Sequence, residues 1–178
     1  MRYYQYITEK KWLKGTMIGF GASPSDLNRV SKYIESWLIK HKIKYEKEKR
    51  PHFTIAQIPE KYPKDDLVRE LSKFDLNMKF KPVDLTVFYG TNVKKDFVVI
   101  EYKPNMKFLQ YFNDIDDKFE IKKFATIKPH VSLFILEQGG MTGDLLNDIK
   151  FSLPTLPILK PTEIELWNNK FEIETRLK

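Results

Sequence analysis

The 178-residue sequence contains no cysteine. Disulfide bonds and thiolate metal sites are therefore excluded. Only three histidines are present, and none of them forms the HExxH-type pair that binds zinc on a helix. The sequence therefore offers little for zinc to bind, and we expect no cofactor.

Long hydrophobic segments are also missing. No run of about 18 apolar residues occurs, which argues against a transmembrane helix. The first 14 residues lack the apolar centre of a secretory signal. We expect a cytoplasmic protein with no membrane association and no obligate protein partner.

Length and charge favour one basic domain. A chain of 178 residues that is 42% hydrophobic suits a single domain over residues 1–178. The formal net charge of +7 attracts polyanions, so a phosphate-bearing partner is favoured. The most basic stretch, 40–50, runs into the first motif described below and could guide a nucleotide there. Because Glu46 and Glu48 dilute its charge, a solvated loop or edge strand remains an equal interpretation.

Two groups of aspartates are candidates for a magnesium site. Asp65-Asp66 and Asp114-x-Asp116-Asp117 could ligate magnesium, but both lie in amphipathic helical patterns. Solvated helix faces or helix starts are the favoured interpretation.

The apolar spacing alternates between strand and helix periods along the chain. It predicts strands over 15–22, 43–45, 52–58, 83–89, 97–102, 130–136, 162–167 and 171–177, and helices over 23–40, 63–74, 105–119 and 143–149. The second half repeats the theme of the first. We therefore predict an α+β fold of two quasi-repeated lobes, with antiparallel sheets flanked by helices.

Two five-residue segments resemble one another and contain two of the three histidines. They are Arg50-Pro51-His52-Phe53-Thr54 and Lys128-Pro129-His130-Val131-Ser132. Side chains alternate between faces along a strand, so each histidine shares a face with the hydroxyl residue two positions later. The apolar alternate residues would point into the cores beneath; these are Phe53, Ile55, Val131, Leu133 and Ile135. Two similar lobes could place both motifs at one shared site.

This pair of His-x-Thr/Ser segments, about 80 residues apart, resembles the two-histidine (2H) phosphoesterase superfamily. The resemblance implies a bilobal fold with both motifs in a central groove, and metal-independent cleavage of 2′,3′-cyclic phosphates or of 2′–5′ and 3′–5′ linked oligonucleotides. By position, His52 and His130 would be the catalytic pair, while Thr54 and Ser132 would hold the phosphate.

The residue types suit this chemistry. Cleaving a phosphodiester needs a base for the attacking hydroxyl, an acid for the leaving oxygen and donors for the other phosphate oxygens. Histidine can take either proton-transfer role near neutral pH. Which of the two histidines is the base stays open.

Further residues could contact the substrate. Trp167 is the first candidate for stacking on a base, followed by Tyr6 and Tyr4, while Arg50 and Lys128 could meet phosphates. The alternative for each is an ordinary packed aromatic or a solvated cation.

Three interpretations of function follow. We favour a phosphodiesterase that acts on a nucleotide or short oligonucleotide. The compact, Lys/Asn/Ile-rich chain resembles phage-encoded members of the anti-CBASS type that destroy cyclic nucleotide signals, and RNA ending in a 2′,3′-cyclic phosphate or 2′–5′ oligoadenylate are alternative substrates. The second interpretation is a non-catalytic nucleotide-binding module. The third is a basic RNA-binding domain with incidental histidines, whose binding would depend strongly on salt.

Overall fold

The chain forms two four-stranded antiparallel sheets. The computed structural model describes residues 15–90, 94–121, 129–168 and 172–177, apart from the side chains of residues 54 and 55. The strands are β1 (Gly15–Ala22), β2 (Tyr45–Lys47), β3 (His52–Pro59), β4 (Lys81–Gly90), β5 (Lys95–Lys103), β6 (His130–Glu137), β7 (Pro161–Trp167) and β8 (Ile173–Leu177). One sheet has the order β3-β1-β7-β8 and the other the order β2-β6-β5-β4. The predicted α+β class is confirmed.

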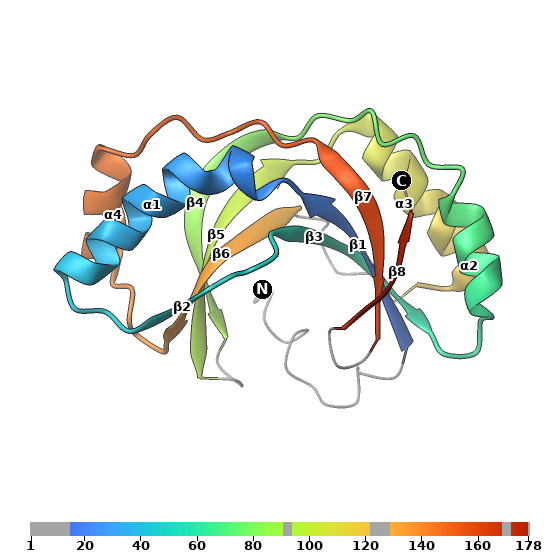
Figure 1. The fold of residues 1–178 in the computed structure, drawn as a ribbon, viewed down its shortest axis with the longest axis horizontal. Coiled ribbons are helices and arrows are strands. Elements are labelled where there is room, and N and C mark those ends of the chain that lie inside the picture. Colours follow the sequence, from blue (N-terminus) through green and yellow to red (C-terminus); the bar gives the residue numbers. More distant parts are fainter. Residues whose placement is uncertain (1–14, 91–93, 122–128, 169–171, 178) are drawn as a thin grey trace.

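The described part of the chain contains four helices, which pack on these sheets. They are α1 (Pro24–Lys40), α2 (Lys64–Leu71), α3 (Met106–Phe119) and α4 (Gly143–Phe151). Figure 1 places α1 and α4 beside the β2-β6-β5-β4 sheet and α2 and α3 beside the other sheet. The Tyr33 hydroxyl of α1 donates to the carbonyl of Ile149 in α4, and Lys118 of α3 pairs with Glu70 of α2. Each lobe is therefore one sheet with two helices.

The lobes do not correspond to the two halves of the chain. Sheet β3-β1-β7-β8 combines the first and third strands with the last two. Helix α1 follows β1 directly but packs in the opposite lobe (Figure 1). The chain therefore crosses between lobes several times, and the quasi-repeat visible in the sequence is interleaved in space.

Local sequence explains where α3 and α4 begin and which side of α1 is buried. Asn105 caps α3 by accepting from the backbone N–H of Phe108 at 2.8 Å, and Thr142 caps α4 through Leu145. In α1, four of the apolar residues at helical spacing are buried and Trp37 is half-buried; the buried ones are Leu27, Val30, Ile34 and Leu38. Helix α2 is shorter than the predicted 63–74 because the chain leaves the helix at Ser72.

A β-bulge follows the motif in each histidine strand. Gly19 pairs with Thr54 and Ile18 with Ala56, so residue 55 has no partner on β1. Val99 likewise pairs with Ser132 and Val98 with Phe134, so Leu133 has no partner on β5. A bulge adds one residue to a strand and resets which face the following side chains occupy.

One predicted core residue is wrong because of the bulge. Phe53, Val131 and Leu133 are buried as expected. Ile135 is only half-buried, because the bulge at Leu133 turns Phe134 and Leu136 inward instead. The side chain of Ile55 lies outside the described residues.

Among the described residues, no helix is long and apolar enough to cross a membrane.

Candidate active site

The two Pro-His segments occupy equivalent backbone positions. The carbonyl oxygen of Pro51 accepts from the backbone N–H of Ala22 at 3.0 Å, at the end of β1. The carbonyl oxygen of Pro129 accepts from the backbone N–H of Tyr102 on β5 at 2.8 Å. Proline has no N–H to donate, so its carbonyl is the group that ties each motif to the neighbouring strand. Each histidine strand thus starts from the same anchor.

The strands that carry the two motifs, β3 and β6, approach one another where the sheets meet. Strand β3 is the edge of its sheet, and β2 covers β6 only from Phe134 to Leu136, after the bulge. The pairing with β2 does not extend to the motif of β6, and Cα atoms of β3 and β6 approach within 8 Å. The backbone N–H of Glu48, in the segment leading into β3, donates to the carbonyl of Leu133 at 2.9 Å. Residues 78 positions apart in the sequence thus share one region.

Both histidines lie on the side of the sheets opposite the helices. Phe53 and Val131, which follow the histidines, are fully buried in the core, whereas His52 and His130 are half-buried. On the same side of β1 as His52, the residues are Gly19 and Gly21, while Ile18 and Phe20 are buried with the core. The Phe20 ring lies 6.1 Å from the Phe108 ring of α3, which fixes the core side.

The ring of His52 is held by two contacts. Its Nδ1 lies 2.8 Å from the carbonyl oxygen of Arg50. A carbonyl oxygen only accepts, so Nδ1 carries the hydrogen and Nε2 holds the lone pair in the neutral ring. The ring centroid also lies 4.6 Å from that of Trp167, with the planes inclined by 58°. His52 therefore presents Nε2 as its proton-accepting atom.

The surroundings of His130 have a similar pattern. The ring of Phe88 on β4 meets the imidazole edge-to-face, with centroids 4.8 Å apart and an interplanar angle of 70°. Glu101 lies directly opposite His130 in the β5–β6 register. Side chains at opposed positions of antiparallel strands are neighbours on one face. Each imidazole therefore has an aromatic ring against it.

The hydroxyl residues follow the same register. Ser132 is half-buried and pairs with Val99, two residues along β6 from His130. The backbone of Thr54 pairs with Gly19, two residues along β3 from His52. The side chain of Thr54 lies outside the described residues, so its phosphate-binding role stays a prediction.

Two carboxylates lie on β7 on the same side of the sheet as His52, and neither was predicted to have a role. Glu163 pairs with Gly21 and Glu165 with Gly19 on β1. Glu165 is 4% exposed. Burial raises the pKa of its carboxyl, the neighbouring Glu163 raises it further, and the charges of His52, Arg176 and Arg50 act in the opposite direction. The alternation in 161–167, with Ile164 and Leu166 buried, was the signal that could have found these residues.

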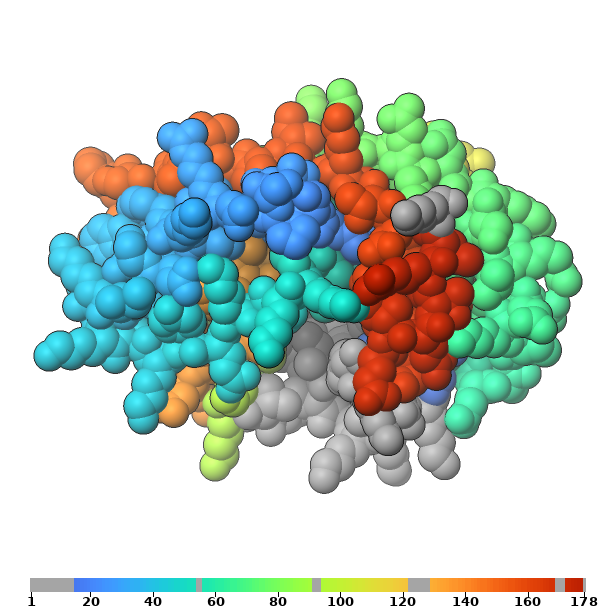
Figure 2. Space-filling view, in the orientation of Figure 1, coloured from blue at the N-terminus to red at the C-terminus, as the bar shows by residue number. Residues whose placement is uncertain are grey.

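Trp167 is the only predicted substrate-contact side chain that the described residues place against a catalytic candidate. It packs on His52 and is 4% exposed. Arg50 is exposed, and its carbonyl, rather than its guanidinium, contacts His52. Figure 2 shows the red C-terminal strands bordering the turquoise segment around β3 on the surface. Tyr4, Tyr6 and Lys128 lie outside the described residues.

The fold is similar to that of Usb1. The structure of Kluyveromyces marxianus Usb1 superposes with a TM-score of 0.53 at 13% identity, covering 92% of this chain and 98% of that one. The same yeast protein with uridine monophosphate gives a TM-score of 0.57 at 10% identity, covering 91% and 97%. The MHV ns2 PDE domain gives 0.49 at 13% identity, covering 86% and 97%. No protein-family model and no curated protein matches the sequence. At these identities the similarity shows the fold.

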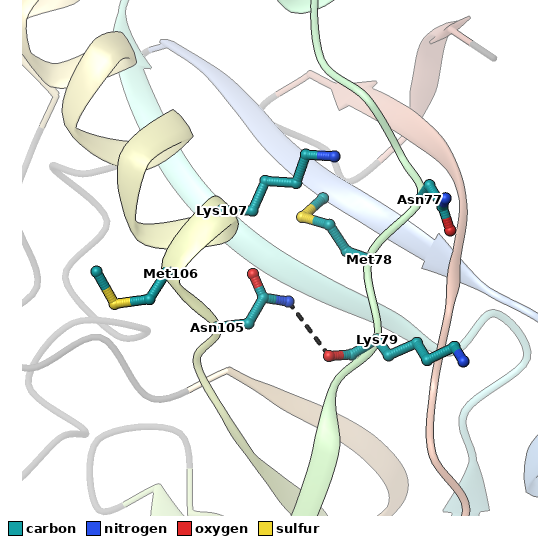
Figure 3. Close-up of a pocket in the computed structure, with 6 residues that line it drawn as sticks. All are labelled: Asn77, Met78, Lys79, Asn105, Met106 and Lys107. Carbon is teal, nitrogen blue, oxygen red and sulfur yellow. Dashed lines mark hydrogen bonds between the residues drawn. The ribbon is translucent and has the colours of Figure 1, made fainter.

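A separate pocket of about 360 Å³ opens at the start of α3 (Figure 3). It is lined by Asn77, Met78, Lys79, Asn105, Met106 and Lys107. The polar groups here have structural partners: the Asn105 amide donates to the Lys79 carbonyl at 3.2 Å, and Lys107 pairs with Asp75. None of the described motif residues lines this pocket.

The acidic pairs considered for magnesium lie on helices. Asp65 and Asp66 occupy the first turn of α2, and Asp66 pairs with Arg69 at 2.7 Å. The other acidic run, 114–117, belongs to α3. Across the described part of the chain, no three His, Asp or Glu residues gather in a metal-binding arrangement.

Proposed function

We propose that this protein is a metal-independent phosphodiesterase that cleaves a nucleotide phosphodiester, with His52 and His130 as the proton carriers. One observation carries the proposal. Both Pro-His-x-Thr/Ser segments have the same proline anchor, the same histidine face and the same bulge after the hydroxyl residue, on strands that approach within 8 Å. Two matched proton carriers at one site suit an acid–base reaction more than simple binding.

In the proposed reaction, a ribose 2′-hydroxyl of the substrate attacks the neighbouring phosphodiester. One histidine takes the 2′-hydroxyl proton on Nε2 as the O2′–P bond forms. The other gives a proton to the departing 5′-oxygen as the P–O5′ bond breaks, leaving a 2′,3′-cyclic phosphate and a free 5′-hydroxyl. Nδ1 of His52 stays bonded to the Arg50 carbonyl throughout, so only Nε2 exchanges protons. Water could then open the cyclic phosphate with the two roles reversed.

Hydroxyl groups would stabilise the negative charge on the nonbridging oxygens of the phosphate in the transition state. Ser132 shares a strand face with His130, and Thr54 is at the matching position after His52. Donors aimed at the nonbridging oxygens are worth about 10²-fold or more in rate in comparable sites. The Ser132 and Thr54 hydroxyls are the donors we assign to this role.

For the substrate we favour a cyclic oligonucleotide messenger, with viral evasion of host immunity as its purpose. The alternatives are RNA with a 2′,3′-cyclic phosphate end and 2′–5′ oligoadenylate. The net charge of +7 supports a polyanionic ligand. The uridine monophosphate bound to the similarly folded Usb1 supports a nucleotide as the ligand class.

The test is a turnover assay with matched histidine variants. Purified protein is incubated in EDTA with cyclic dinucleotides and trinucleotides, 2′–5′ oligoadenylate and RNA ending in a 2′,3′-cyclic phosphate, and products are separated by chromatography. His52→Ala and His130→Ala should each lower the rate by about 10²–10⁴-fold. His41→Ala is the control, since this exposed histidine ends α1 and stacks on Trp37.

Two outcomes would overturn the proposal. Absence of turnover for every substrate, with nucleotide affinity unchanged in His52→Ala and His130→Ala, would leave a binding module. Turnover that requires added magnesium would leave an enzyme but remove the metal-independent mechanism.

A further inference from the structure

Trp167 reaches His52 from two strands away. It is the last residue of β7, β1 lies between β7 and β3, and Met17 is its register partner on β1. Neighbouring strands are about 4.8 Å apart, so a side chain on β7 must span about 10 Å to reach β3. The indole nevertheless contacts the imidazole, with centroids 4.6 Å apart. The indole can cross β1 only where that strand has no side chain on this face.

Gly19 is the residue of β1 that the indole crosses. A Cβ atom at position 19 would lie 2.1 Å from Cη2 and 2.5 Å from Cζ3 of Trp167. These atoms belong to the far edge of the six-membered ring of the indole. The indole therefore lies directly over the α carbon of Gly19, where any side chain would exclude it.

Burial shows that the indole is part of the protein's packing. Trp167 is 4% exposed, whereas His52, which it contacts, is half-buried. A tryptophan with so little free surface has little face to offer to a nucleobase. The described aromatic partner of Trp167 is His52.

The contact restricts His52 in a direction that its hydrogen bond leaves free. The Nδ1 bond to the Arg50 carbonyl fixes one edge of the imidazole, but the ring can still tilt about that bond. The indole blocks one side of this tilt. A group that transfers protons must be held close to its productive geometry, and a misplacement of about 1 Å can cost about 10²-fold in rate.

We propose that Trp167 is a positioning residue for His52: seated on Gly19, its indole holds the imidazole so that Nδ1 donates to Arg50 and Nε2 remains available for proton transfer. This inference rests on the proposed function for its catalytic consequence. Its structural part, the ring orientation and tautomer of His52, is independent of turnover.

The experiment compares Trp167→Leu with Trp37→Leu. Trp37 also contacts a histidine, His41, at 5.3 Å, so the control removes the same kind of contact elsewhere. Nitrogen-15 NMR of the three histidines reports the tautomer of each ring in the absence of substrate. We expect Trp167→Leu to shift His52 from the Nδ1–H form to a mixture of tautomers, and Trp37→Leu to leave His52 unchanged.

Kinetics separate positioning from base stacking. With the substrate found by the turnover assay, Trp167→Leu should lower kcat by about 10²-fold while KM stays within about twofold. Loss of a stacking contact would instead raise KM at constant kcat. Trp167→Phe retains apolar bulk but lacks the ring edge that lies over Gly19, so it carries the same test if Trp167→Leu does not fold.

An unchanged His52 tautomer in a folded Trp167 variant would overturn the inference, as would a rise in KM alone. Failure of the proposed function is a distinct result: the wild-type protein would turn over no substrate, while the NMR comparison would still decide whether Trp167 orients His52.

Discussion

The Nδ1 atom of His52 lies 2.8 Å from the carbonyl oxygen of Arg50, two residues earlier in the chain. The turn before β3 thereby determines which imidazole nitrogen carries the hydrogen, since a carbonyl can only accept. The motif therefore includes a backbone group that a pattern of side chains does not reveal.

This relationship predicts that His52→Asn is folded and inactive. The asparagine amide nitrogen can occupy the place of Nδ1 and donate to the Arg50 carbonyl, but no group replaces Nε2. We expect a melting temperature close to that of the wild type and a rate lowered by about 10²–10⁴-fold, measured by thermal denaturation and single-turnover assay. His41→Asn is the control. A His52→Asn rate within tenfold of the wild type would remove His52 from proton transfer.

Gly19→Ala should destabilise the fold. Its Cβ would meet the Trp167 ring at 2.1 Å and the carbonyl oxygen of Phe53 at 2.4 Å, and backbone cannot move aside cheaply. We expect a loss of about 1–3 kcal/mol in the free energy of unfolding, measured by denaturant titration. Gly21→Ala should cost less, since its nearest contact is the flexible Cγ of Glu163 at 3.0 Å. Gly143→Ala, with nothing within 4 Å, is the neutral control, and equal losses at all three positions would contradict the crowding over Gly19.

Glu165→Gln should stabilise the protein more at pH 8 than at pH 4. Burial raises the pKa of the Glu165 carboxyl in the folded state, so the folded protein binds this proton more tightly than the unfolded chain does. Stability from this group is present below the ordinary glutamate pKa of about 4.3 and is lost as pH rises through the raised value. Glutamine cannot ionise and avoids that loss.

Melting temperatures of wild type and variant across this pH range provide the measurement. Glu163→Gln is the matched control, because both carboxylates lie near Nε of Arg176, at 3.7 Å for Glu163 and 3.8 Å for Glu165, while the Glu163 side chain is 22% exposed. A variant-minus-wild-type difference for Glu165→Gln that does not grow with pH would contradict the burial effect.

Tyr102→Phe should be neutral or stabilising. Tyr102 is 2% exposed, its hydroxyl has no hydrogen-bond partner among the residues that the structure describes, and burial raises its pKa. Removing the hydroxyl removes an uncompensated desolvation cost and keeps the edge-to-face contact with Phe53 at 5.3 Å. Tyr33→Phe offers the comparison, since it loses a bond to the Ile149 carbonyl and should cost about 1 kcal/mol. The prediction fails if Tyr102→Phe is the more destabilising of the two in chemical denaturation.

Much of the fold could be predicted because its signals are local. The strand over 15–22 has the predicted bounds, and the strand pair β4–β5 and the helix after Asn105 lie where the apolar spacing placed them. Burial of one face imposes a period of two on strands and of 3.6 on helices, and these periods can be read in a single sequence. Bulges break the period, and this is why Ile135 was assigned to the wrong side.

The sequence by itself determined which residues we propose for the chemistry: two histidines in matched Pro-His segments, each one position away from an apolar residue and two from a hydroxyl residue. Only the tertiary structure decided their surroundings. The contact of Trp167 with Gly19, the placement of Glu165 where it senses the charge of His52, and the interleaving of the two lobes depend on strand order and register. Each of them joins segments that are not adjacent in the sequence, and local periodicity contains no information about which strands become neighbours.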